Sequence, residues 1–117
     1  SRNDDKIFAQ TPDYEGYTTS LVQTILGSPE KQITDPAYIA ESFENTELEN
    51  IKNLYRKGKI TEEQAHAFLL GAVDLKQASK FGVDYTIYTY KNNTIQLVFE
   101  NDQLLYITPN PDVVFFK

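Results

Sequence analysis

The chain of 117 residues has no cysteine, no tryptophan, no methionine and a single histidine. Without cysteine it can form no disulfide framework and no thiolate metal site, and it has no thiol nucleophile. This absence is compatible with either a reducing or an oxidising compartment. The fold must therefore rest on an ordinary hydrophobic core, for which 40% hydrophobic and 13% aromatic residues are sufficient in one domain of this length.

Positive charge is also scarce. The chain has 11 Lys and Arg against 17 Asp and Glu, which gives a net charge of −6 and a pI near 4.7. Its only basic cluster is Arg56, Lys57 and Lys59. Neutralising the phosphates of a nucleic acid requires clustered Lys and Arg, so we expect no nucleic-acid partner. No apolar run approaches the length of a transmembrane helix.

The absence of methionine bears on the start of the chain, which is polar and charged over residues 1–6. A native translation product begins with methionine, so we expect that a segment upstream has been removed. A cleaved signal peptide would explain this, and a polar start suits a tether behind a membrane anchor. A cytoplasmic protein freed from a tag would explain it as well. We expect residues 1–16 to be a loop or tether and residues 17–117 to form a single domain.

Motifs for catalysis, cofactors and metals are missing too. His66 would need a partner, which only Glu62 and Glu63 could supply at helical spacing, so we interpret it as a solvated helix histidine. No glycine-rich turn is placed to cradle a phosphate, and no serine lies in a nucleophile elbow. The acids of the middle region lack the pattern of a calcium loop, and we interpret them as a solvated helix face: Glu41, Glu44, Glu47 and Glu49. We therefore predict a non-enzymatic protein without catalytic residues, cofactor or metal.

The strongest positive signal is a β-meander. Residues 85–91, 94–100 and 103–108 are rich in β-branched and aromatic side chains, and Asn-Asn and Asn-Asp pairs separate them. Asn and Asp tolerate the positive φ that two-residue hairpin turns require. Two such turns predict a register that pairs Tyr90 with Ile95, Tyr88 with Leu97, Thr86 with Phe99, Phe99 with Leu104 and Leu97 with Tyr106. Residues 113–116 offer a fourth strand, at an edge because prolines precede them.

Helices are expected before the meander. Apolar spacing and a Gly-Ser-Pro stop predict a short helix over residues 18–27. Asp35-Pro36 predicts a second start, and capping boxes predict helices that begin at Thr46 and at Thr61, the last reaching about Ser79. Helices first and antiparallel strands last indicate an α+β fold, with N-terminal helices packed on one face of a C-terminal antiparallel three- to four-stranded meander.

The predicted register divides the sheet into two faces. One carries aromatic and aliphatic side chains throughout and is the expected core face: Tyr88, Tyr90, Leu97, Phe99 and Tyr106. The opposite face is mixed and carries an apolar stripe, which we expect to be at least partly accessible and to bind a partner. The members of this stripe are Tyr85, Ile87, Val98, Leu105 and Ile107.

Two segments carry a resemblance to a known superfamily. Residues 17–29 end in Leu26-Gly-Ser-Pro29, and residues 88–104 contain the Tyr-rich hairpin. Together they resemble the β-lactamase-inhibitor-protein-like superfamily, which includes the SmpA/OmlA outer-membrane assembly lipoproteins and uncharacterised Gram-positive lipoproteins of streptococcal type. The resemblance implies helices on one face of an antiparallel sheet whose other face can bind proteins. The chain departs from the pattern by inserting residues 33–80 between the two segments.

These observations favour one function and leave a second open. The first is a non-enzymatic extracytoplasmic domain of a surface lipoprotein, attached to the membrane only through a removed N-terminal anchor, which recognises an unknown protein partner through the open sheet face. The alternative is a small domain, cytoplasmic or secreted, that binds a peptide or small ligand in a cleft between helices and sheet.

Overall fold

A computed structural model describes residues 16–112. Its elements in chain order are α2 (Thr19–Leu26), β1 (Lys31–Ile33), α3 (Pro36–Glu41), the π-helix η1 (Ser42–Thr46), α4 (Glu47–Arg56), α5 (Glu62–Lys80), β2 (Thr86–Tyr90), β3 (Ile95–Glu100) and β4 (Gln103–Ile107). The helices precede the meander, which confirms the α+β class. Apart from Gly16, the predicted tether lies outside the described residues, as does the predicted strand at 113–116.

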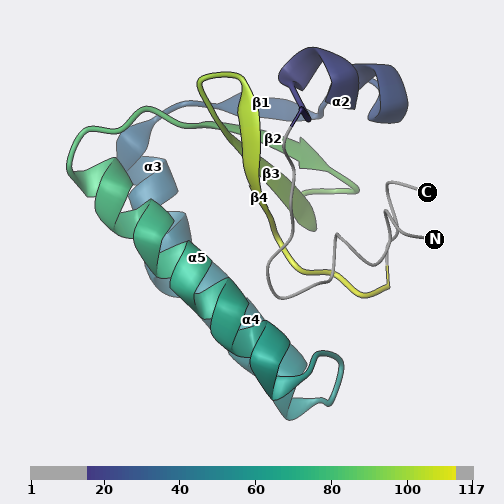
Figure 1. Cartoon of the computed structure of the whole chain (residues 1–117), viewed down its shortest axis with the longest axis vertical. Coiled ribbons are helices and arrows are strands. Elements are labelled where there is room, and N and C mark those ends of the chain that lie inside the picture. The colour runs from purple at the N-terminus through teal and green to yellow at the C-terminus, as the bar shows by residue number, and fades with distance from the viewer. Residues whose placement is uncertain (1–15, 113–117) are drawn as a thin grey trace.

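The strands form one antiparallel sheet in the order β1-β2-β3-β4. The predicted meander β2-β3-β4 is confirmed. Its partner at the β2 edge is the short β1, in which Ile33 pairs with Ile87, a strand that no pattern in the sequence predicted. The chain therefore enters the sheet once before the long helices and returns to it after them (Figure 1).

The second hairpin turn uses the predicted pair Asn101-Asp102, whereas the first is wider than the predicted pair Asn92-Asn93, because Lys91 and Thr94 also lie outside the strands and Lys91 has positive φ. Asn92, Asn93, Asn101 and Asp102 all have positive φ. The first turn is held from outside, because the Glu30 carboxylate accepts the backbone N–H groups of Asn92 and Asn93 at 2.8 and 3.1 Å. The predicted register between β2 and β3 is confirmed throughout.

The register between β3 and β4 contains a β-bulge. Phe99 pairs with Leu104 as predicted, but the next pair on β3 is Val98 with Tyr106, which leaves Leu105 as an extra residue. The predicted pairing of Leu97 with Tyr106 is therefore wrong, and Leu97 pairs with Ile107. One inserted residue moves every later side chain to the opposite face. Tyr106 consequently joins the face of Val98, and Ile107 joins that of Leu97.

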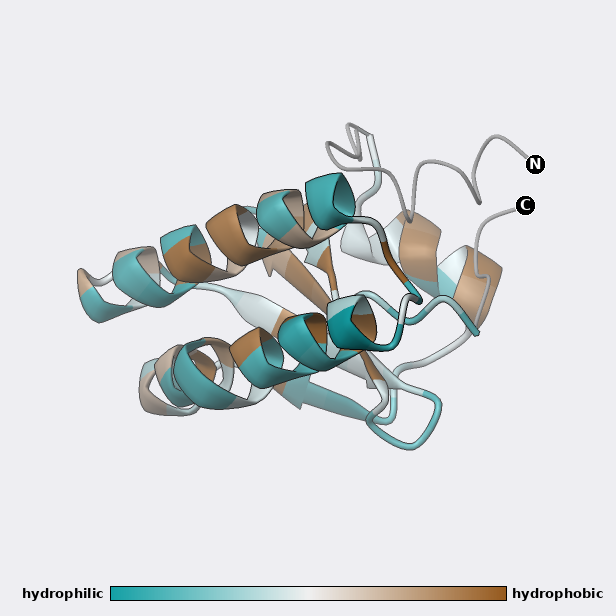
Figure 2. Ribbon diagram, turned by 90° about the horizontal axis from the view of Figure 1, so that it is seen from below, coloured by the Kyte–Doolittle hydropathy of each residue, from teal (hydrophilic) through white to brown (hydrophobic). Residues whose placement is uncertain are grey.

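Helices lie on both faces of the sheet. The helices α3, η1, α4 and α5 cover one face and share a core with its strands: Ile39, Phe43, Ile51, Phe68, Ala72, Leu75, Ile87, Val98 and Tyr106. On the other face, Val22 of α2 packs among Tyr88, Tyr90, Leu97 and Phe99. Figure 2 shows the strands between the long helices and the largely apolar α2. The long helices pack on one face as predicted, but that face carries Ile87 and Val98, and the expected core face of Tyr88 and Leu97 is covered by α2.

This arrangement corrects the expectation of an accessible stripe. Ile87 and Val98 are 0% exposed, Ile107 is 1% exposed and Tyr85 is 6% exposed, whereas Leu105 is 43% exposed. The first cause is that the stripe face lies under the long helices. The second is the bulge, which turns Ile107 toward α2 and pushes Leu105 outward. The sheet face that the sequence offered to a partner is thus part of the core.

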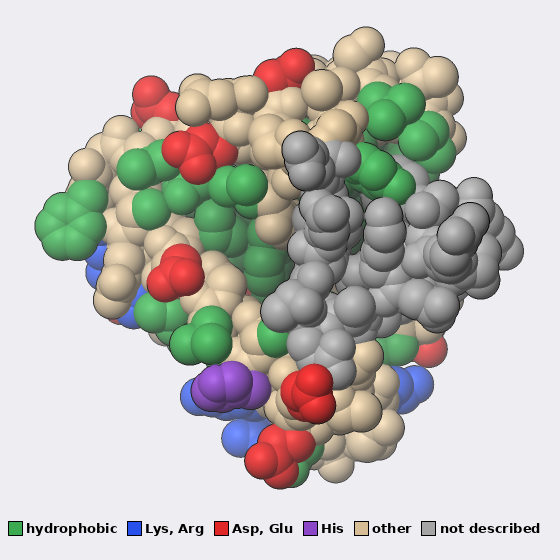
Figure 3. Space-filling view, in the orientation of Figure 1, with side chains coloured by type: hydrophobic (Ala, Val, Ile, Leu, Met, Phe, Trp, Pro, Cys, Tyr) green, Lys and Arg blue, Asp and Glu red, His purple; other side chains and the backbone are tan. Residues whose placement is uncertain are grey.

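The helix α5 begins as predicted. Thr61 and Gln64 form a complete capping box, in which Gln64 N–H donates to the Thr61 hydroxyl at 3.0 Å and the Gln64 side chain accepts from Thr61 N–H at 2.9 Å. His66 follows on the exposed side of the helix, as expected of a solvated histidine, and is the purple side chain in Figure 3.

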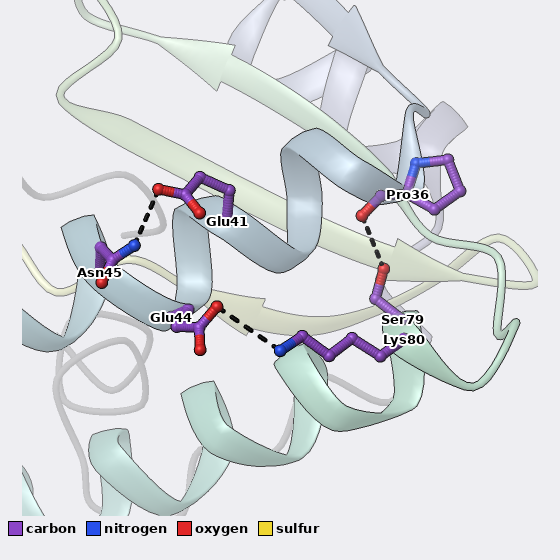
Figure 4. A network of polar contacts seen from close by, with 6 residues as sticks. All are labelled: Pro36, Glu41, Glu44, Asn45, Ser79 and Lys80. Carbon is purple, nitrogen blue, oxygen red and sulfur yellow. Dashed lines mark hydrogen bonds and ion pairs between the residues drawn. The ribbon is translucent and has the colours of Figure 1, made fainter.

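Polar contacts connect the end of α5 to both α3 and η1 (Figure 4). The Ser79 hydroxyl donates to the Pro36 carbonyl at 3.2 Å, and Lys80 Nζ lies 3.5 Å from a Glu44 carboxylate oxygen. The helix α4 begins at Glu47, where the sequence predicted a helix start, but the predicted capping box is wrong, because Thr46 has helical φ and ψ and makes no capping hydrogen bond. The chain instead continues from α3 into α4 through the π-helix.

None of the helices in residues 16–112 combines the length and apolar character needed to cross a bilayer.

The buried sheet face gives a direct test. Val98→Lys should destabilise the domain by more than about 4 kcal/mol and unfold it, because the ammonium group would enter a closed apolar core. Leu105→Lys, on the same sheet, should cost less than about 1 kcal/mol because the bulge already exposes that side chain. Urea denaturation followed by circular dichroism measures both. A folded Val98→Lys protein would show that the helices do not close over β3.

Candidate functional site

A cleft of about 560 Å³ opens between the helical segment α3–η1–α4 and the hairpin end of the sheet. Such a volume lies within the roughly 300–1,000 Å³ of typical ligand sites. The helices contribute Tyr38, Glu41, Ser42, Thr46, Glu47, Asn50 and Leu54 to its wall, and the sheet and its loops contribute Asn93, Thr94, Gln96, Thr108, Pro109 and Asn110. The cleft is therefore built by segments far apart in the sequence.

Glu47 is the buried charged residue of this cleft. Its side chain is 5% exposed, and it is the only carboxylate buried within residues 16–112. Its backbone N–H donates to the carbonyl of Ser42, five residues earlier, which is the hydrogen bond that defines the π-helix. Such single π turns occur frequently at functional sites. The irregular turn thus ends at the residue whose burial is most unusual.

The carboxylate of Glu47 is held by two donors. The Tyr106 hydroxyl donates to Oε2 at 2.5 Å, and Asn50 Nδ2 lies 3.4 Å from Oε1. The shorter distance is typical of a hydrogen bond from a hydroxyl to an ionised oxygen. Asn50 also lies 3.5 Å from the Pro109 carbonyl, so it spans the cleft from helix to loop.

Tyr106 itself is fixed by its surroundings. Its ring makes edge-to-face contacts with Phe43 and Phe68, with centroid distances of 5.6 and 6.1 Å. On the α5 side it packs against Gly71, where a Cβ atom would lie 3.2 Å from two ring carbons. Glycine in the middle of a helix costs stability, and here it makes room for the tyrosine. The hydroxyl is thereby aimed at Glu47.

Burial raises the pKa of Glu47 from 4.5 to about 7. Desolvation is the largest cause, because the charged form loses its water. The hydrogen bonds from Tyr106 and Asn50 act in the opposite direction and offset only part of it. Near neutral pH the site therefore exchanges a proton readily, which is a property of functional carboxylates.

The floor of the cleft is an ordered polar surface. The Thr108 N–H and hydroxyl both donate to the Gln96 carbonyl, at 3.0 and 3.2 Å, and the Gln96 amide donates to Asn93 Oδ1 at 3.2 Å. Directly opposite Gln96 in the register is Thr89, which is 1% exposed. Its hydroxyl oxygen has no hydrogen-bond partner within residues 16–112. This hydroxyl is buried and Thr89 does not line the cleft, so the polar surface of the floor comes from Asn93, Gln96 and Thr108.

The charges that line the cleft have one sign. Glu41 and Glu47 are its ionisable acids, and no lining residue within 16–112 is Lys or Arg. Glu41 is exposed at the rim and accepts a hydrogen bond from Asn45 Nδ2 at 2.7 Å (Figure 4). The remaining polar groups are amides and hydroxyls. This chemistry suits reversible binding by hydrogen bonds, with one group that can gain or lose a proton.

The stripe residues lie elsewhere. Tyr85 and Leu105 meet at a shallower depression of about 260 Å³ beside α5, together with Gly71, Asp74 and Tyr106. Apolar side chains gather there, between α5 and the sheet, on the face shown in Figure 3. Ile87, Val98 and Ile107 do not reach this depression. His66 lines neither hollow.

Sequence reasoning missed the buried acid. Glu47 was grouped with Glu41, Glu44 and Glu49 on a solvated face, and that interpretation is wrong for Glu47 alone of the four, since it is buried. A signal was present, because Ile39, Phe43, Glu47 and Ile51 recur at a spacing of four, which places the acid on the apolar side of the helical segment. Tyr106 had no such signal, because its position depends on the bulge.

The chain matches a known protein family. Residues 1–116 match the protein family described as "Domain of unknown function (DUF4947)". No curated protein and no solved structure matches the chain.

The raised pKa of Glu47 predicts a pH-dependent stability. The folded state holds the proton up to about pH 7 and the unfolded chain releases it near 4.5, so this group's contribution to stability is lost as pH rises from 4.5 to 7. Glu47→Gln has no carboxyl group to titrate at this position. Its free energy of unfolding relative to that of the wild type should therefore increase by about 3 kcal/mol as the pH rises from 4.5 to 7, and should not change further above pH 7. Glu49→Gln is the control, because it removes an exposed carboxylate from the same helix. A parallel pH dependence in both variants would contradict the burial of Glu47.

The Tyr106 hydroxyl should matter most when Glu47 is ionised. Tyr106→Phe should raise the pKa of Glu47 further, and should cost about 1–3 kcal/mol at pH 8 but less at pH 5, where the carboxyl is neutral. Chemical denaturation at the two pH values, with an NMR titration of the Glu47 carboxyl, measures this. Tyr55→Phe removes an exposed hydroxyl and is the matched control. Equal losses at both pH values would show that the hydroxyl does not act through the carboxylate.

Proposed function

The chain belongs to the family described as a domain of unknown function (DUF4947), and we propose that it is a non-enzymatic binding domain that takes a short peptide or a small polar molecule into the cleft between α3–η1–α4 and the sheet. Of the functions that the sequence left open, this is the alternative that the geometry supports best. It is carried by one observation, a cleft of ligand size whose wall contains a buried carboxylate.

The construction of the wall supports the proposal. A regular helix and a regular hairpin would suffice to cover the core, but the chain has a π turn at η1 and a bulge in β4. Both irregularities end at the same hydrogen bond, between Glu47 and Tyr106. Bulges and π turns are frequent next to functional sites, where they re-aim a side chain.

Recognition through the open sheet face has less support. Four of the five residues assigned to it are buried, and Leu105 is the member that remains exposed. A protein partner at that face would have to use the shallow depression beside α5 instead of the stripe. Its volume of about 260 Å³ is below the size of typical ligand sites.

The extracytoplasmic, lipid-anchored location remains a prediction from the resemblance and from the polar start of the chain. It is independent of the cleft. The natural sequence upstream of Ser1 tests it, because a signal peptide that ends in a lipidated cysteine would support a surface lipoprotein. An initiator methionine directly before Ser1 would overturn that location and leave the binding proposal unchanged.

Binding in the cleft can be tested without knowing the natural ligand. The probes are capped pentapeptides of the form Ac-Ala-Ala-X-Ala-Ala-amide, with each coded amino acid at X, and a panel of monosaccharides. We expect at least one probe to shift the amide NMR signals of Asn50, Gln96 and Thr108. Thr46→Trp places an indole at the cleft wall. This variant should bind that probe about tenfold or more weakly, because the indole fills the space that the ligand needs.

The control is Asn53→Trp, an exposed position of α4 outside the cleft, which should bind the probe as the wild type does. The proposal fails if no probe shifts the cleft amides. It also fails if the shifts gather around Leu105 and Gly71, or if the two tryptophan variants weaken binding equally.

A further inference from the structure

We propose that the ligand of the cleft presents a positively charged group, a primary ammonium or a guanidinium, which binds beside Glu47. This inference rests on the proposed function and names the chemical class of its ligand. It assigns Glu47 as the charge-recognising residue, with Tyr106 and Asn50 positioning its carboxylate.

The first support is the charge balance of the cleft. The described part of the chain has basic residues, but they lie outside the cleft: Arg56 is 3.7 Å from Glu49, Lys59 is 3.6 Å from Asp112 and Lys80 is 3.5 Å from Glu44. Glu41 and Glu47 are left without a basic residue in the wall. An anionic ligand would meet two carboxylates, whereas a cation would supply the missing counter-charge.

The second support is the unused hydrogen-bonding capacity of Glu47. Each carboxylate oxygen has two lone pairs, and the donors seen on them are the Tyr106 hydroxyl on Oε2 and the distant Asn50 amide on Oε1. An ammonium or guanidinium group brings several N–H donors and no acceptor, which complements such a carboxylate. Glu47 lines the cleft, so the proposal places the cationic group at the cleft wall next to this residue.

The third support is the shape of the approach. Tyr38, at the cleft wall, is 40% exposed, and Leu54 and Pro109 also line the cleft. The side chains of Lys and Arg have an apolar stem and a charged head. Apolar parts of this lining can contact the stem, and an exposed aromatic ring also attracts cations. A neutral sugar could hydrogen-bond to the amides and the acids, but it would not supply a counter-charge to the two carboxylates.

Proton exchange at Glu47 couples binding to pH. The groups that face its carboxyl are Tyr106 from β4 and Asn50 from its own helix, and the other ionisable side chains of the cleft are Glu41 and Tyr38. Burial keeps Glu47 largely protonated below about pH 7 in the free protein. A cation favours the ionised form, so its binding releases the proton, and affinity should rise with pH.

The experiment uses three matched probes, Ac-Ala-Ala-X-Ala-Ala-amide with X as lysine, norleucine or glutamate, titrated into the full chain and followed by the amide signals of Asn50, Gln96 and Thr108. At pH 8 the lysine peptide should bind about tenfold or more tightly than the norleucine peptide, and the glutamate peptide should bind most weakly. From pH 8 to 5.5 the lysine peptide should lose about ten- to thirtyfold in affinity, as expected if it binds only the ionised carboxyl with a pKa of about 7.

Two variants assign the effect to its residue. Glu47→Gln should reduce the preference for lysine over norleucine to about one and abolish the pH dependence. Glu49→Gln, which removes an exposed acid of the same helix outside the cleft, should retain both. Equal binding of the lysine and norleucine peptides at the cleft, or unchanged selectivity in Glu47→Gln, would overturn this inference while leaving the proposed function intact. If none of these three peptides, and no probe of the wider panel, shifts the cleft amides, the proposed function itself fails and the inference with it.

Discussion

The hydrogen bond between Tyr106 and Glu47 is the constraint on which both layers of this domain depend. A carboxylate taken out of water is costly unless its oxygens are paired, and leaving one unpaired costs more than the bond itself contributes. The helical segment η1–α4 supplies the acid and β4 supplies the donor. Any shift of the helices along the sheet would separate them. The bond therefore fixes the relative position of two apolar layers that hydrophobic contact alone would hold less specifically.

Three local departures from regular structure make this bond geometrically accessible. Without the extra residue Leu105, Tyr106 would lie on the face of Leu97 and point toward α2. Gly71 then provides the room that its ring needs against α5. On the helical side, the π turn ends at Glu47 and carries the chain from α3 into α4 without a break. Each departure from regular structure costs some local stability, and all three converge on one side-chain contact.

Whether a feature could be predicted from the sequence depends on how far apart in the chain the residues that determine it are. The Asn-rich turns, the capping box of Thr61 and Gln64 and the register of β2 with β3 depend on residues close in sequence. The bulge does not, because residues 104–107 are apolar throughout and fit either face equally well. The covered face was misassigned for the same reason, since both faces of β2 and β3 are rich in apolar side chains. The acid of the cleft stood at apolar spacing in the sequence, but only the position of Tyr106 shows why it can be buried there.

An acid at position 47 is difficult to explain by stability alone. Replacing a buried charge by a neutral or apolar side chain of similar size is often neutral or stabilising. Here the desolvation that raises the pKa of Glu47 is only partly offset by its two donors, so the folded protein is less stable at neutral pH than it would be without the charge. A cation in the cleft would offset the remainder by stabilising the ionised form. Glu47 thus destabilises the free protein, and its ionised form would stabilise a complex with a cationic ligand. This is the energetic pattern expected of a binding site.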